Sequence, residues 1–79
     1  MSYSAMLDWY DKKTETFIGD EEADDLNFEE LSKILKVPIE QVTAGGYRVD
    51  EANIEGLQKF YKHNIDLEKY IYIFEVCEG

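Results

Sequence analysis

The sequence is poor in basic residues. Its 79 residues include 8 lysines and arginines against 18 aspartates and glutamates, which gives a formal net charge of −10. Nucleic acids and anionic membrane surfaces both recruit positively charged protein surfaces, so we expect this protein to bind neither. The natural complement of such a negative surface is a basic protein.

Cysteine and long apolar runs are also scarce. The single cysteine, Cys77, excludes an internal disulfide and favours a reducing compartment. No run approaches the about 18 consecutive apolar residues that cross a bilayer. Residues 1–11 lack the basic start and the apolar segment of a signal peptide. These absences predict a cytoplasmic protein, and the length allows one domain over residues 1–79.

The residues that carry most enzyme chemistry are few. His63 and Cys77 occur once each and lie in different predicted elements, so the sequence offers no candidate nucleophile-base pair. We interpret His63 as a packing or surface residue and Cys77 as a buried, unreactive thiol. Gly45 and Gly46 lack the context of a phosphate-binding loop. The sequence therefore predicts neither an enzyme nor a bound cofactor.

One acidic run, residues 20–25, concentrates much of the negative charge. It lacks the alternating acids and the distal glutamate of a calcium-binding loop, so we predict no metal site there. Charge runs of this kind are usually solvated, and we interpret this one as a surface loop.

Apolar and aromatic residues, in contrast, are plentiful. They make up 44% and 14% of the chain, too much for a disordered acidic segment, so we expect a folded domain. Residues 7–10 alternate, with Leu7 and Trp9 on one side, which predicts a strand with one buried face. Turn-forming residues 11–14 and a β-branched and aromatic run at 15–19 follow. Together these segments predict a β-hairpin.

A helix is predicted after the acidic run. Asn27 is placed to cap it, with Glu30 three residues later as the capping-box partner. Apolar residues recur at helical spacing over residues 28–35, and Val37-Pro38 ends the pattern because the residue before proline avoids the α region.

The second half of the chain predicts strand, helix and strand. Residues 47–49 form a short strand, and Asp50 caps a helix with an apolar stripe over residues 54–61. Gly56 weakens that helix by about 1 kcal/mol relative to alanine. Residues 70–74 are apolar on both sides, so the last strand is either central with both faces covered, or one sheet face meets another protein. The predicted class is α+β, in the order β-β-α-β-α-β.

Aromatic residues exceed what so small a core obviously needs. Tyr10, Phe17 and members of the run 70–74 are of the types enriched in the centres of protein interfaces, although aromatics also fill cores. An acidic surface with an aromatic patch would be steered rapidly onto a basic partner.

Residues 7–21, LDWYDKKTETFIGDE, resemble the opening hairpin of the cloacin immunity family. Members of that family are cytoplasmic inhibitors of bacteriocin ribonucleases that cleave 16S ribosomal RNA. Weaker matches are the Lys-Val-Pro of residues 36–38, Gly46, the His-Asn-Ile-Asp of residues 63–66, and the aromatic spacing of the last strand. The resemblance touches most of the chain, and its first hairpin is the specific part.

The resemblance implies an antiparallel four-stranded sheet with short helices, one face of which is available to a basic toxin domain. The family's aromatic contact positions fall on Tyr10, Phe17, Arg48 and Ile71, and its specificity position falls on Tyr47. We expect the acids of the hairpin to speed encounter with the toxin. The predicted toxin-binding residues are Tyr10, Asp11, Phe17, Asp20, Glu21, Glu22, Tyr47, Arg48 and Ile71.

This chain departs from the family where specificity would be set. Arg48 replaces an aromatic residue, Tyr47 is bulky where the family can carry cysteine, and the acidic tail is shortened to Glu78-Gly79. The expected partner is therefore a related nuclease domain of a bacteriocin or of a contact-dependent inhibition system. We expect one-to-one binding, and a monomer or weak dimer when the protein is free.

Two alternatives belong to other functional classes. One is a self-associating or regulatory module whose sheet face packs on its own copy. The other is a hydrolase that uses pairs of acids, which has less in its favour because 18 acids produce such pairs by chance. The resemblance of the hairpin, rather than residue periodicity, favours the inhibitor.

Overall fold

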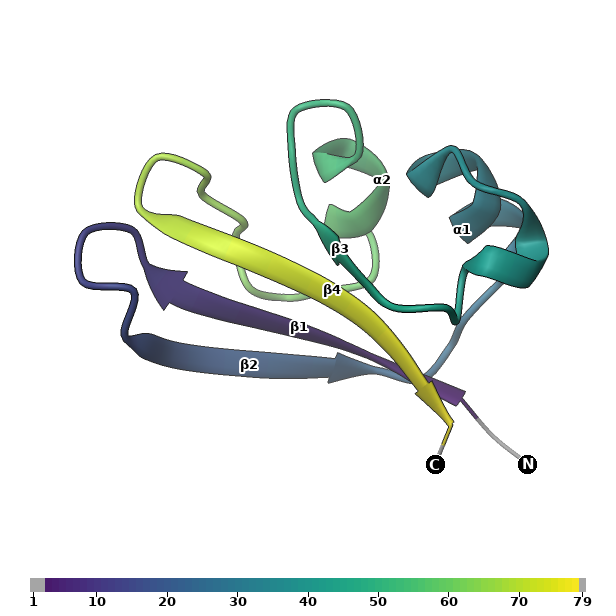
Figure 1. Ribbon diagram of the computed structural model, residues 1–79, viewed down its shortest axis with the longest axis horizontal. Helices are drawn as coiled ribbons and strands as arrows, with labels where there is room; N and C mark the ends of the chain where they lie inside the picture. The colour runs from purple at the N-terminus through teal and green to yellow at the C-terminus, as the bar shows by residue number, and fades with distance from the viewer. Residues whose placement is uncertain (1–2, 79) are drawn as a thin grey trace.

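An open four-stranded antiparallel sheet forms one layer of the structure, and two short helices lie together on one side of it (Figure 1). The computed structural model describes residues 3–78. The strand order is β2-β1-β4-β3. The elements are β1 (Tyr3–Asp11), β2 (Phe17–Ala23), α1 (Phe28–Leu35), the 3-10 helix η1 (Ile39–Gln41), β3 (Gly46–Arg48), α2 (Ile54–Gln58) and β4 (Tyr70–Glu78). The predicted α+β class and element order are confirmed.

The first hairpin forms as predicted, but its second strand begins at Phe17, two residues later than expected, and extends to Ala23. The Asp11 carboxylate accepts hydrogen bonds from the backbone N–H groups of Lys13 and Thr14, at 2.8 and 3.0 Å, and so caps the turn between β1 and β2. Residues 20–23 then pair with β1, so the prediction of a surface loop over the whole acidic run is wrong. Strand alternation sends the acids of residues 20–22 to both faces of the sheet instead of into solvent on all sides.

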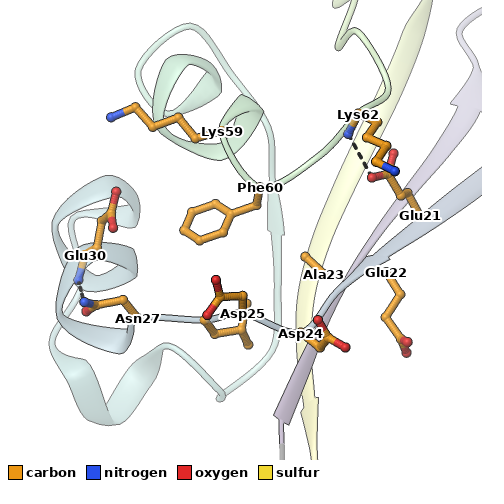
Figure 2. A pocket seen from close by; sticks show the side chains of 11 residues that line it. Glu21, Glu22, Ala23, Asp24, Asp25, Asn27, Glu30, Lys59, Phe60 and Lys62 are labelled. Carbon is orange, nitrogen blue, oxygen red and sulfur yellow. Dashed lines mark hydrogen bonds between the residues drawn. The ribbon is translucent and has the colours of Figure 1, made fainter.

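Helix α1 begins where the sequence predicts. The Asn27 side-chain oxygen accepts a hydrogen bond of 3.0 Å from the backbone N–H of Glu30 (Figure 2). The helix ends at Leu35, because Lys36 adopts a left-handed conformation (φ 59°) and the Val37 N–H bonds back to the Ser32 carbonyl.

Two of the later elements differ from prediction. β3 lies one residue earlier than expected, and α2 covers only Ile54–Gln58. The Asp50 carboxylate accepts hydrogen bonds from the N–H groups of Ala52 and Asn53, so it caps the turn before α2 rather than the helix. Phe60 and Tyr61 follow after the helix has ended.

The core lies between the sheet and the helices. Its largest fully buried side chains are Leu7, Leu31, Val42, Leu57, Tyr72 and Phe74. β4 is central, because it pairs with both β1 and β3. Its alternate residues Tyr72, Phe74 and Val76 are buried beneath the helices, whereas Ile71 and Ile73 point the other way and are half-buried. The helices therefore cover one sheet face only. Among the described residues, no helix is long and apolar enough to cross a membrane.

Candidate functional site

The sheet face opposite the helices is the candidate site, and we call it the open face. Its members follow from strand alternation, since the side chains of Tyr72, Phe74 and Val76 define the covered face. Cross-strand pairing then assigns the residues of the other strands. The open face consists of Phe17, Asp20 and Glu22 from β2; Ser4, Met6, Asp8 and Tyr10 from β1; Ile71, Ile73, Glu75 and Cys77 from β4; and Gly46 and Arg48 from β3.

An aromatic and apolar row crosses one end of the open face. The register of β1 and β2 shifts after the pair Trp9–Gly19, so that Tyr10 pairs with Phe17 and Ile18 is the extra residue of a bulge. The Tyr10 and Phe17 rings meet edge to face, with centroids 5.7 Å apart. Phe17 is 52% exposed, and Ile71 of β4 continues the row beside Tyr10. Phe17 is the exposed member of this row, and Tyr10 and Ile71 are half-buried.

Acidic side chains occupy the middle of the open face. Asp8 of β1 lies directly opposite Asp20 of β2, and Glu75 projects from the neighbouring strand β4. Burial raises the pKa of Asp8, and the negative charges of Asp20 and Glu75 raise it further. Like charges placed opposite each other in a sheet are destabilising. A cation supplied by a partner would relieve this repulsion.

Six of the nine predicted contact residues share the open face: Tyr10, Phe17, Asp20, Glu22, Arg48 and Ile71. The expectation of one shared face is wrong for Asp11, Glu21 and Tyr47. The Asp11 carboxylate is engaged with the hairpin turn, and its hydrogen bonds from Thr14 and Lys13 lower its pKa. The Tyr47 ring packs against the core on the helix side, and its hydroxyl donates to the Gln41 carbonyl.

Glu21 serves as an internal clamp on the helix side of β2. Its two carboxylate oxygens accept hydrogen bonds from the backbone N–H groups of Lys62, at 2.8 Å, and His63, at 2.9 Å. Figure 2 shows the first of these bonds. Backbone hydrogen bonding, from Lys62 above all, lowers the pKa of Glu21. The clamp holds the segment that follows α2 against the edge of the sheet.

An aromatic cluster lies directly beneath the open face. The His63 ring stacks on Trp9, with centroids 3.9 Å apart, and its Nε2 lies 2.7 Å from the Tyr72 hydroxyl. That hydroxyl also accepts a hydrogen bond from the Asp66 N–H. His63 is thus a packing residue, as we interpreted it. The cluster packs on the covered side of β1 and β4, the two central strands that carry the open face.

Cys77 is not the buried thiol that we predicted. It is half-buried on the open face, and its Sγ donates to a Glu75 carboxylate oxygen at 3.3 Å. This hydrogen bond, with some burial, raises the pKa of the thiol. Alternation along β4 explains the difference, because Phe74 and Val76 take the covered positions.

A second acidic feature is a hollow of about 690 Å³ beside the end of β2, the start of α1 and the segment after α2 (Figure 2). Its lining includes Glu21, Asp24, Asp25, Lys59 and Phe60. Among the positions that the structure describes, no group of three metal-ligating side chains is arranged to hold an ion. The open face therefore remains the stronger candidate.

Asp8, Ile73 and Glu75 also belong to the site, although we did not predict them from the sequence. Alternation in the first strand already placed Asp8 on the same side as Tyr10, which was a usable signal. Ile73 and Glu75 join the site through the pairing of β4 with β1 and β3, which no local pattern reveals.

Replacing Glu21 with alanine should lower the free energy of unfolding by about 1–2 kcal/mol. Hydrogen bonds to a charged group contribute about 1.5–3 kcal/mol, and partial exposure reduces that contribution here. The melting temperature should fall by about 4–12 °C, as measured by circular dichroism. Glu22→Ala is the matched control, because Glu22 is exposed on the opposite face of the same strand.

The pH dependence of Glu21→Ala gives a second test of the clamp. Because folding lowers the pKa of Glu21 from its ordinary value of 4.5, its contribution is complete above that value and is lost as the pH falls through the folded-state pKa. The difference in melting temperature between wild type and Glu21→Ala should be large at about pH 7 and shrink on acidification. An equal difference at both ends of the titration would contradict the clamp.

Residues 4–75 match the family described as "Domain of unknown function (DUF7683)". No curated protein matches the chain. The matched segment runs from the first strand to the middle of β4, so it contains both helices and nearly all of the sheet. The chain therefore belongs to the DUF7683 family.

Proposed function

We propose that this protein is an immunity protein that binds a cognate basic cytotoxic nuclease one-to-one and holds it inactive. The observation that carries the proposal is the open face, on which the exposed Phe17 and the half-buried Tyr10 lie beside carboxylates of β1 and β2. The resemblance of residues 7–21 to the cloacin immunity hairpin supports it. The toxin would be a ribonuclease domain of a bacteriocin or of a contact-dependent inhibition system.

Charge and apolar contact would play different parts in this complex. Asp8, Asp20 and Glu22 attract a basic surface from a distance, which raises the association rate. Tyr10 and Phe17 become buried on contact, and aromatic anchors of this kind mainly slow dissociation. An inhibitor of a lethal enzyme needs both, since free toxin keeps acting on its target.

The proposed target also bears on the compartment. An immunity protein against a nuclease that attacks intracellular RNA must act in the cytoplasm. The half-buried Cys77 is compatible with that reducing environment, in which a thiol stays unoxidised.

Self-association through the same face is the second candidate, and the exposure of Phe17 favours it. However, two copies packed through their open faces would bring Asp8, Asp20 and Glu75 of each close to those of the other. The net charge of −10 adds to this repulsion. A stable dimer in sedimentation that becomes monomeric on Phe17→Ala would favour this candidate over the inhibitor.

The test of the proposal uses the C-terminal domain of the protein encoded immediately upstream of this chain. We expect that domain to be basic, to cleave RNA, and to lose this activity when one equivalent of the protein is added. Binding kinetics should show the association rate falling about tenfold or more as ionic strength rises from about 0.01 M to about 0.15 M, with little change in dissociation. Absence of a complex would overturn the proposal, and a flat salt response would remove the steering argument.

A further inference from the structure

The charge of the open face is unequal across its width. Carboxylates lie on β2, β1 and β4, whereas the exposed side chain at the β3 edge is a cation, Arg48. A surface whose only task was to attract positive charge would gain nothing from this residue. The position of Arg48 therefore suggests that the partner carries a negatively charged group at this edge of the face.

The backbone holds Arg48 firmly on the open face. Its neighbour Tyr47 is anchored on the helix side by the core and by the Gln41 carbonyl. The Arg48 carbonyl accepts a hydrogen bond from the Asn53 side-chain amide at 3.3 Å, and the following N–H, that of Val49, bonds to the Tyr72 carbonyl. With both flanking positions fixed, strand alternation leaves Arg48 a single direction.

None of the described residues lies close enough to Arg48 to serve as its counter-ion. Directly opposite it on β4 lies the apolar Ile73. The acid closest to it in register is Glu75, a diagonal neighbour at roughly 7–8 Å, and the Oε1 atom of Glu75 accepts a hydrogen bond from Cys77. Within residues 3–78, Arg48 forms no ion pair with a carboxylate.

Docking changes the energetics of this guanidinium. When a partner covers the open face, Arg48 loses water, and a desolvated charge without a counter-ion is strongly unfavourable. A carboxylate on the partner would satisfy it through two parallel hydrogen bonds, a geometry for which arginine is well suited. A wholly basic contact surface would instead repel it.

We propose that the nuclease partner, although basic overall, places an acidic side chain against Arg48 and cationic side chains against Asp8 and Asp20. This inference rests on the proposed function and extends it to the chemistry of the partner. The opposite charges at the two sides of the open face fix one orientation of the complex. Arg48 is then a specificity-determining residue.

A charge-reversal pair tests the inference against general electrostatic attraction. Arg48→Glu and Lys33→Glu each replace a cation with an anion and so change the net charge from −10 to −12. Lys33 is exposed on α1, on the covered side of the sheet. Binding to the upstream-encoded nuclease domain is measured for wild type and for both variants, together with Arg48→Lys. Their melting temperatures are compared to confirm that each variant is folded.

We expect Arg48→Glu to weaken binding at least tenfold through faster dissociation, Lys33→Glu to bind as wild type or slightly faster, and Arg48→Lys to recover part of the loss. In addition, reversing one acid of the nuclease domain should restore binding to Arg48→Glu. If Arg48→Glu binds as tightly as Lys33→Glu, the inference is overturned while the proposed function stands. If wild type does not bind the domain, both fail.

Discussion

A variant in which Tyr10 and Phe17 are both replaced by alanine should bind the proposed nuclease partner at least about a hundredfold more weakly than wild type. The two rings pack edge to face at the end of the open face, and Phe17 is 52% exposed in the free protein. Buried aromatic anchors at interfaces commonly contribute about 2 kcal/mol or more each, and each 1.4 kcal/mol corresponds to about tenfold in affinity. Most of the loss should appear in the dissociation rate.

The control for this variant is Ile39→Ala. Ile39 has nearly the same exposure, 48%, but lies in η1, which packs beside α1 away from the open face. Its replacement should leave affinity unchanged. The double variant should stay folded with a melting temperature only several degrees lower, because it loses the contact between the two rings but no residue of the buried core. If the double variant and Ile39→Ala lost the same amount of affinity, or none, the nuclease would not dock on the open face.

The local parts of this fold were predictable because their signals are local. The cap of α1 depends on Asn27 and Glu30, three residues apart, and the first hairpin depends on alternation and on the turn residue Asp11. The prediction of a surface loop at residues 20–25 was wrong because it relied on the acidic composition of the run and not on the alternation of its side chains. Charged residues suggested solvent on all sides, whereas the strand turns Glu21 inward to accept two backbone N–H groups.

The candidate site was predictable only in part, because it depends on how distant strands pair. Tyr10 and Phe17 are neighbours through a hairpin and could be grouped from the sequence. Ile73 and Glu75 reach the open face through pairing with residues more than sixty positions away in β1. Tyr47 lies in a strand of three residues, too short to show which way its side chain points.

Gly56 illustrates the same limit in the core. From the sequence, Gly56 lowers the stability of the second helix, and alanine in its place should raise that stability by about 1 kcal/mol. In the structure, a Cβ at this position would lie 2.5 Å from Cγ1 and 2.8 Å from Cδ1 of Ile34. Glycine therefore permits the close approach of α2 to α1, which the helix propensity scale does not consider.

Replacing Gly56 with valine should accordingly destabilise the protein by about 2–3 kcal/mol, since extra carbons forced into a packed contact displace their neighbours. The melting temperature should fall by about 10–20 °C, a large loss for a domain of this size. Gly56→Ala should lower the melting temperature less than Gly56→Val does, because its gain in helix propensity offsets part of the clash.

A double-mutant cycle identifies the cause. The three atoms nearest to the new Cβ all belong to Ile34, so Ile34→Ala removes them. Gly56→Val should therefore cost much less in the Ile34→Ala background than in wild type, with a coupling of about 1 kcal/mol or more. If Gly56→Val lowered the free energy of unfolding equally in both backgrounds, the steric explanation would be refuted, and helix propensity would explain the loss. Because α1 and α2 lie on the side opposite the open face, the folded fraction of each variant should bind the nuclease as wild type does, which separates the packing of the scaffold from recognition.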